Sequence, residues 1–447
     1  MKKTSAFILI VAILVCCLAG CAKQSTSDST ATANPTANAQ TTDGTTTPDE
    51  QDASTSDTTD IPQIYTLLTE TSLAGLKSPY IADRSNINKA WPKTPSSDKI
   101  VIGWAELTMS NPWFVDVANA ADAKAASYGY ELKRLVCDSD PVKQSEQIDT
   151  FISQGVDIIV VNPADCMAVI ADIQRAVDAG IPVCTSAGIL TQEDCPLLTS
   201  IGSSPWGCGF EAGKYIATQY DANEQLVAAN IIGVLGNPTS EGRVNGMVTG
   251  VIYQRLKNLG YDYADADVYL MAYNFYQDIV TKGQAELVEA NFKVVNQLVG
   301  SWTEEGGMSC AEDILTANSD VSLIIAENDW MGMGAYKAIT NAGKTDSVKV
   351  GCCADGVVDA VEMVKNGELL TTGGNSAVQQ GEEVVNFIYK IFNGELDPNN
   401  LPIASYFPEV AITGDNVDNY YDPSLPYFKF ENMTFLSVPE LIDSLQK

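Results

Sequence analysis

From Lys99 onward, the chain alternates short apolar runs with amphipathic segments that stop at glycine. The runs KIVIGWAE, VDIIVVNP and IPVCTS are apolar throughout, as expected for strands that are buried on both faces. The segments 140–155 and 164–180 between them have helical periodicity and close at Gly155 and Gly180. Buried strands that alternate with such helices predict a parallel sheet covered by helices on both sides.

The same alternation starts again after residue 203 and predicts a second α/β unit. Its expected strands are 227–236, 321–328 and 347–353, and its expected helices are 240–260, 329–343 and 356–367. We therefore predict two doubly wound, Rossmann-like lobes. In open sheets of this kind, ligands bind beyond the carboxyl ends of the strands, where the strand order reverses.

The stretch SNPWF, residues 110–114, lies at such a strand end. Asn111 is expected to cap a helix, with Pro112 in its first position and Trp113 and Phe114 in its first turn. Neighbouring residues on a helix do not share one face. The two aromatic side chains therefore cannot both enter the same core.

Composition removes several classes of function. The formal net charge is −31, and no basic stripe is present to neutralise phosphates, so we expect no nucleic-acid partner. The chain has no histidine, which excludes histidine-dependent hydrolytic triads and histidine-based zinc sites. No Cys-x-x-Cys spacing and no serine nucleophile elbow is found either. We expect a protein that is not an enzyme and that uses no metal or cofactor.

The first 60 residues are interpreted as a targeting segment followed by a tether. Residues 1–20 combine a positive start with a short apolar stretch, as in a signal peptide. They end in Leu18-Ala19-Gly20 before Cys21, which resembles the lipobox of bacterial lipoproteins and implies cleavage and lipidation at Cys21. An uncleaved anchor or a plain secretory signal is the alternative. Residues 21–60 are rich in Ser, Thr and Asp and are expected to form a disordered tether. Residues 61–98 are expected to be an extension that packs on the main body.

Residues 99–415 resemble the type I, sugar-binding periplasmic-binding-protein family, which includes ribose- and galactose-binding proteins. The resemblance is carried by SNPWF, DPVKQSEQIDTFISQGVDIIVVNPAD, AGIPV, GRVNG, AENDWMGMGAYKAI, ADG and NGELLTTGGNSAVQQG in this order. It implies two lobes joined by three hinge crossings near 202–204, 375–376 and 408–409. The implied first lobe is 99–203 with 376–408, the second is 204–375 with 409–419, and 420–447 is a C-terminal extension.

The resemblance also implies a ligand site between the lobes. Its expected residues are Asn111, Trp113, Phe114, Asn162, Arg243, Trp302, Asn328, Asp355 and Asn375. Aromatic rings would cover the C–H faces of a sugar, and the amide and charged groups would meet its hydroxyl rim. Asn328 and Asp355 also start expected helices, so capping is an alternative role for both. Trp206 and Trp330 are expected in the core or at the rim.

Three features depart from the family pattern. Where the family carries an Asp-Arg pair after its fourth strand, this chain has Ala187 and Gly188. The segment 262–300 is longer than the usual link. VGCCADG has extra residues before Asp355. A monosaccharide is therefore the first expectation for the ligand, and a polyol, deoxy-sugar or nucleoside stays open.

Eight cysteines follow Cys21, and their spacing does not select a pairing. Cys195 and Cys208 flank the first hinge and are the one pair that we would test for a disulfide. Cys184, Cys352 and Cys353 lie in expected strands and are interpreted as small buried apolar residues.

The resemblance implies a monomeric, lipid-anchored receptor on the outer face of the bacterial cell membrane. Its partners would be a small sugar-like solute and the permease and ATPase subunits of an ABC importer. A sensory receptor that presents the ligand to a membrane histidine kinase or chemoreceptor is the alternative.

Overall fold

The computed structural model describes residues 62–76, 84 and 87–445. The signal peptide, the tether and Cys21 lie outside these residues. The chain divides into two units, Met1–Asp57 and Thr58–Lys447, and the description below concerns the second.

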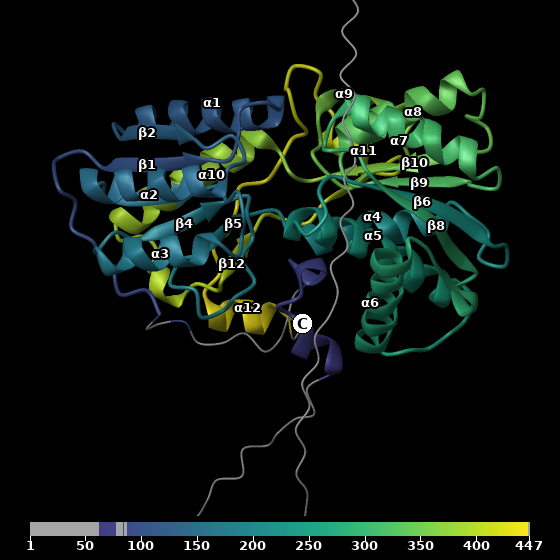
Figure 1. The fold of residues 1–447 in the computed structure, drawn as a ribbon, viewed down its shortest axis with the longest axis horizontal. Helices are drawn as coiled ribbons and strands as arrows, with labels where there is room; N and C mark the ends of the chain where they lie inside the picture. Colours follow the sequence, from purple (N-terminus) through teal and green to yellow (C-terminus); the bar gives the residue numbers. More distant parts are fainter. Residues whose placement is uncertain (1–61, 77–83, 85–86, 446–447) are drawn as a thin grey trace, which may run out of the picture. The chain divides into compact units, whose positions relative to one another are not determined.

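A six-stranded parallel sheet, ordered β12-β5-β4-β3-β1-β2, forms the first lobe (Figure 1). Its strands are β1 (Val101–Glu106), β2 (Glu131–Val136), β3 (Ile158–Val161), β4 (Val183–Ser186), β5 (Ser200–Gly202) and β12 (Ala404–Tyr406). Its helices are α1 (Pro112–Ser127), α2 (Pro141–Gln154), α3 (Val169–Asp178) and α10 (Ala377–Phe392). Ile102 and Trp104 of β1 pack in one core with α1 and α10, whereas Ala105 packs in another with α2 and α3. Successive residues of a strand point to opposite faces, so both faces of this sheet are covered.

The second lobe holds a five-stranded sheet ordered β10-β9-β6-β8-β7. Its strands are β6 (Leu226–Ile232), β7 (Ala285–Leu287), β8 (Phe292–Val299), β9 (Leu323–Ala326) and β10 (Lys349–Gly351), and only the β7–β8 pair is antiparallel. Its helices are α4 (Pro205–Thr218), α5 (Pro238–Asn258), α6 (Asp265–Lys282), α7 (Glu304–Ala317), α8 (Asp329–Asn341) and α9 (Val358–Lys365), with a 3₁₀ turn η3 (Val288–Ala290). Helices α4 and α5 approach so closely at Gly213 that a side chain would not fit there. A Cβ at this position would lie 2.1 Å from the Met247 carbonyl oxygen.

The chain passes between the lobes three times: from β5 to α4, from β11 (Thr371–Gly373) to α10, and from β12 to β13 (Ala411–Thr413). Strands β11 and β13 pair antiparallel. The two-lobe α/β fold predicted from the sequence is confirmed. The lobe boundaries given above remain predictions.

The long segment 262–300 contains elements that the sequence did not predict. Helix α6 and the edge strand β7 precede β8, which lies between β6 and β7 in the sheet.

The helix that the sequence predicts from residue 164 begins only at Val169, because residues 164–168 form bends and turns. The eight described cysteines are free, so Cys195 and Cys208 form no disulfide.

Both terminal extensions contact the lobes. The 3₁₀ turns η1 (Gln63–Leu67) and η2 (Thr71–Leu73) place Ile64 and Leu73 in a cluster with Trp206 and Phe210. The buried Arg84 donates to the carbonyls of Cys195 (2.8 Å) and Leu197 (3.1 Å) in the first lobe. After β13 the chain forms α11 (Val417–Tyr420) and α12 (Val438–Leu445), and η4 (Pro398–Asn400) precedes β12.

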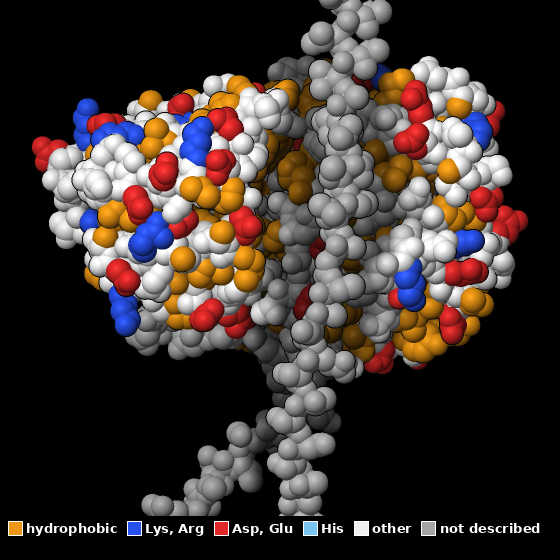
Figure 2. All heavy atoms as spheres, in the orientation of Figure 1, with side chains coloured by type: hydrophobic (Ala, Val, Ile, Leu, Met, Phe, Trp, Pro, Cys, Tyr) orange, Lys and Arg blue, Asp and Glu red, His pale blue; other side chains and the backbone are white. Residues whose placement is uncertain are grey.

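On the face shown in Figure 2, acidic and basic side chains of the described residues are interspersed, without a continuous basic patch. None of the helices in the described part of the chain has the length and apolar composition needed to cross a bilayer.

Candidate functional site

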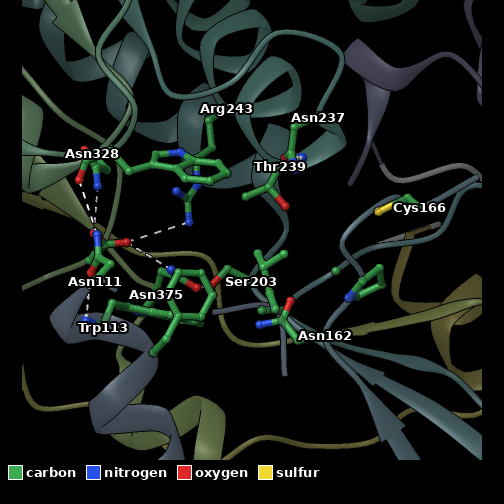
Figure 3. A pocket seen from close by; sticks show the side chains of 17 residues that line it. Asn111, Trp113, Asn162, Cys166, Ser203, Asn237, Thr239, Arg243, Asn328 and Asn375 are labelled. Carbon is green, nitrogen blue, oxygen red and sulfur yellow. Dashed lines mark hydrogen bonds and ion pairs between the residues drawn. The ribbon is translucent and has the colours of Figure 1, made fainter. Parts of the chain in front are cut away.

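A cavity lies between the lobes, at the carboxyl ends of strands from both sheets (Figure 3). It encloses about 730 Å³ of space, part of it open to solvent. All nine residues expected from the sequence line it: Asn111, Trp113, Phe114, Asn162, Arg243, Trp302, Asn328, Asp355 and Asn375. The structure therefore brings the whole predicted set together, from segments up to 264 positions apart (from Asn111 to Asn375). Their role in ligand binding remains a prediction.

The start of α1 supplies two aromatic rings. Asn111 caps the helix, as predicted, by accepting from the Trp113 backbone N–H at 2.8 Å. Trp113 is 6% exposed, and its indole N–H donates to the Asn375 carbonyl oxygen at 2.8 Å, which fixes α1 to the second hinge crossing. Phe114 is half-buried and meets Trp113 edge to face at 5.1 Å. One ring is thus held by the hinge, and the other is freer to cover a ligand.

Trp302 forms a wall from the second lobe, just after β8. Its backbone is left-handed (φ +57°), and its carbonyl oxygen accepts from the Asn111 side chain of the first lobe at 3.4 Å. The indole lies on Gly233, where a Cβ would be 1.9 Å from Nε1. Its N–H donates to the buried carboxylate of Glu327. The ring is therefore fixed from two sides.

Asp355 is the centre of a buried polar network. It accepts from Asn375 at 3.0 Å and from Asn328 at 3.1 Å, and the Arg243 guanidinium lies 3.9 Å away. Asn328 also caps α8 through the Met331 N–H, so its expected capping role is confirmed, and its contact with a ligand remains a prediction. Asp355 itself does not cap α9, which begins after Val357. Burial raises the pKa of Asp355, and the nearby Arg243 opposes this effect.

Arg243 is the cation of the cavity. It is 5% exposed, and no described residue accepts a hydrogen bond from its guanidinium. Its attraction to Asp355 and Glu327 keeps the buried charge compensated. Its guanidinium is therefore the charged donor that the cavity can offer to a ligand.

One of the two polar groups of the Asn162 side chain is used in a hydrogen bond within the protein. Its amide nitrogen donates to Glu106 at 2.9 Å, which leaves the amide oxygen as the group that it can present to a ligand. Glu106 is fully buried, and burial raises the pKa of its carboxyl group. This glutamate thus positions Asn162 and the Trp104 indole N–H, which lies 3.0 Å away.

Sequence reasoning missed Ser203, Asn237 and Thr239, which also line the cavity. Asn237 caps α5 and is followed by Pro238, the same Asn-Pro start that marks α1 at Asn111. This repeated start after a buried strand was the signal that could have found Asn237 and Thr239. The other lining residues are Leu107, Pro163, Cys166, Ala187 and Gly188.

The cavity offers hydrogen bonds and ring surfaces, without an arrangement for covalent chemistry among the described residues. Burial raises the pKa of the Cys166 thiol to about 12, so it is not a thiolate at neutral pH. No group of three or more acidic, cysteine or histidine residues in the described ranges could hold a metal ion. Trp206 is buried away from the cavity, and Trp330 lines a neighbouring pocket that shares Phe114 and Trp302 with it.

Comparison with known proteins identifies relatives of this chain. The family model for the periplasmic binding protein domain matches residues 102–396. The ribose import binding protein RbsB of Escherichia coli (strain K12) is 27% identical over 296 residues, which cover 66% of this chain and 86% of that protein. The D-apiose import binding protein of Actinobacillus succinogenes is 26% identical over 276 residues, which cover 62% of this chain and 76% of that protein.

Solved structures share the fold. A periplasmic solute binding protein from Actinobacillus succinogenes 130z with bound D-allose has a TM-score of 0.57 and 23% identity, over 72% of this chain and 100% of that one. A solute binding protein from Bacillus halodurans C-125 with bound myo-inositol has a TM-score of 0.57 and 24% identity. The match covers 73% of this chain and 98% of that one. The chain therefore belongs to the periplasmic binding protein family and is a solute-binding protein, not an enzyme.

Proposed function

We propose that this protein is a monomeric, lipid-anchored receptor that binds a small sugar-like solute between its lobes and delivers it to an ABC importer. The observation that carries the proposal is the cavity itself, in which aromatic rings from both lobes accompany a buried amide, carboxylate and guanidinium set. A pyranose or furanose has C–H faces and a hydroxyl rim, which match these two kinds of surface. The Trp113, Phe114 and Trp302 rings would cover the faces.

The relatives support this ligand class. Those named above are import binding proteins for ribose and D-apiose, and the structural neighbours hold D-allose and myo-inositol. Two carry a pentose in their name, one holds a hexose and one a cyclic polyol, so the class includes sugars and polyols. A nucleoside also has a ribose ring and belongs in the same screen.

A thermal-shift screen tests the binding proposal. Pentoses, hexoses, polyols and nucleosides are added singly to the purified protein. A ligand that binds only the folded state raises the melting temperature in proportion to the logarithm of its concentration. We expect one group of sugars or polyols to do so and to be recovered chemically unchanged. Steady conversion of the ligand to product would contradict a receptor function.

Delivery is tested in cells that carry the gene. Deleting the gene should abolish uptake of the radiolabelled ligand, and restoring it should recover uptake. Unchanged uptake together with loss of a ligand-dependent transcriptional response would instead favour the sensory alternative.

The anchor is tested at Cys21. Cys21→Ala removes the thiol that would carry the lipid, so this variant should leave the membrane fraction or stay unprocessed. A parallel Cys17→Ala variant should behave like the parent. Normal processing and membrane retention of the Cys21→Ala protein would contradict the anchor.

A further inference from the structure

Four residues at one end of the cavity form a surface with few hydrogen-bonding groups. This apolar wall consists of Pro163 and Cys166 after β3, and Ala187 and Gly188 after β4. Proline has no N–H, alanine has no polar side chain, and the Cys166 thiol is a weak donor. Asn162 beside the wall contributes its amide oxygen, to which no described residue donates a hydrogen bond.

Backbone hydrogen bonds use the polar groups of Gly188 inside a tight turn. The Gly188 N–H donates to the Ser186 carbonyl at 2.7 Å, and the Gly188 carbonyl accepts from the Thr185 hydroxyl at 2.6 Å. A Cβ at Gly188 would lie 2.2 Å from Pro163 Cδ, so the proline ring occupies the place of a side chain. The backbone polar groups of Gly188 are therefore used within the turn, and the side chains of Pro163, Ala187 and Gly188 offer no partner to a ligand hydroxyl.

The facing wall comes from the start of α5 and has the opposite character. Asn237 uses its amide oxygen to cap the helix, accepting from Thr239 N at 2.9 Å, and no described residue accepts a hydrogen bond from its amide nitrogen. The Thr239 hydroxyl and the Arg243 guanidinium form no hydrogen bond with any described residue. Thr239 and Arg243 are four positions apart and share one helix face. Figure 3 shows Asn237, Thr239 and Arg243 along the same side of the cavity.

We infer that the ligand is two-sided: its hydroxyls face α5, and an edge that lacks a hydroxyl, such as a methyl or deoxy position, faces the apolar wall. This inference rests on the proposed function and narrows its ligand class. A hydroxyl against the wall would lose its water and gain no strong side-chain partner from the four wall residues. A sugar with that hydroxyl should bind ~10- to 100-fold more weakly than the same sugar without it.

Matched sugar pairs test the inference by isothermal titration. The probes are L-fucose with L-galactose, L-rhamnose with L-mannose, and 2-deoxy-D-ribose with D-ribose. Within each pair the members differ in one hydroxyl. We expect at least one deoxy member to bind ~10- to 100-fold tighter than its hydroxylated partner.

The outcomes separate the two proposals. If the hydroxylated members bind as well as or better than the deoxy members, or if only fully hydroxylated sugars bind in the screen, the inference is wrong and the receptor function stands. If no sugar, polyol or nucleoside binds, the proposed function is wrong and the inference falls with it.

A variant tests the wall itself. Ala187 has φ +61°, a backbone conformation that asparagine tolerates, so Ala187→Asn should fold and add an amide to the wall. In a sugar pair whose deoxy member binds the parent more tightly, Ala187→Asn should change the ratio of the two affinities by ~10-fold or more in favour of the hydroxylated sugar. Ala187→Gly suits the same backbone, adds no polar group and should retain the deoxy preference. A folded Ala187→Asn protein, judged by its melting curve, with an unchanged ratio would overturn the assignment.

Discussion

At the scale of single residues, Arg243 carries the strongest expected ligand contact. Its buried guanidinium has no hydrogen-bond acceptor among the described residues. Arg243→Ala should weaken binding of a ligand from the screen by ~10- to 150-fold, since a charge-assisted hydrogen bond contributes about 1.5–3 kcal/mol.

The exposed Arg175→Ala on α3 provides the control for the loss of one positive charge. Its affinity should equal that of the parent in the same titration. If Arg243→Ala remains folded and binds as tightly as Arg175→Ala, Arg243 does not contact the ligand.

Asp329 should make the free energy of unfolding depend on pH. It accepts from the Val357 N–H at 2.9 Å and from the Thr372 hydroxyl, and burial raises its pKa to about 8, with the nearby Asp355 adding to the rise. Between pH 3.8, the ordinary pKa of an aspartate side chain, and about pH 8, the folded protein holds a proton that the unfolded chain has lost. Stability contributed by this group therefore falls as pH rises through this window.

Asp329→Asn tests this linkage. The amide keeps an acceptor for Val357 and can donate to Thr372, so the variant should fold. The slope of unfolding free energy against pH should become shallower by up to about 1.4 kcal/mol per pH unit between pH 5 and 7, measured by urea unfolding. The exposed Asp320→Asn should keep the parent's slope. Equal slopes in both variants would show that Asp329 is ionised in the folded protein.

The sequence predicted the cavity residues that begin helices or follow strands in recognisable motifs. Asn111, Asn328 and Asp355 are of this kind. It could not predict the left-handed turn at Trp302 or the partnership of Trp302 with Glu327, because the indole is placed by contacts with Gly233 and Glu327, which are distant in the sequence. The role of Pro163 opposite Gly188 is likewise visible only in three dimensions.

At the scale of elements, the C-terminal segment joins the two lobes once more. Tyr427 pairs with Val357 of the second lobe, and its hydroxyl donates to Asp116 of α1 in the first lobe at 2.9 Å. Farther along, the Glu431 carbonyl accepts from Gln379 at 2.8 Å, and Phe435 packs on Phe387 of α10. This segment is therefore a fourth connection, in addition to the three hinge crossings.

Tyr427→Phe removes the inter-lobe hydrogen bond and retains the ring. If the bond belongs to the closed arrangement, its loss should weaken ligand binding by ~10- to 150-fold and speed release, since a hydrogen bond to a charged group contributes about 1.5–3 kcal/mol. Stopped-flow release and titration measure both quantities.

Tyr128→Phe is the matched control. Its hydroxyl donates to Asn386 at 2.7 Å, and both residues belong to the first lobe. This variant should lose stability without changing the release rate. Equal release rates in the two variants would mean that the Tyr427 bond does not distinguish open from closed lobes.

The alternation of elements was predictable because each buried strand is an uninterrupted apolar run. Strand β8 escaped prediction since FKVVNQLV carries polar residues and is only partly buried at most of its positions. Strand β7 could not be separated from a long link, because it has three residues. Helix α6 buries Val268, Ala272, Phe275, Tyr276 and Ile279 at helical spacing, and this stripe was the signal that could have found it.

At the scale of the whole molecule, the cavity is complete only when both lobes contribute. Trp113 and Phe114 come from the first lobe, and Arg243 and Trp302 come from the second. A ligand that touches both sets gains contacts only in the closed arrangement and therefore shifts the population toward it. Small-angle scattering should show a smaller radius of gyration when a ligand from the screen is added, and an unchanged radius would contradict closure.

The central claim is that this inter-lobe cavity binds a sugar-like ligand reversibly, and isothermal titration of the parent and a Trp113→Ala/Phe114→Ala variant tests it most directly. We predict saturable one-to-one binding by the parent and at least 10-fold weaker binding by a variant that still melts cooperatively, because the ligand loses ring contact and buried area. Equal affinity in the two proteins would contradict the claim. Loss of binding together with loss of the folded state in the empty variant would assign these two rings to the core.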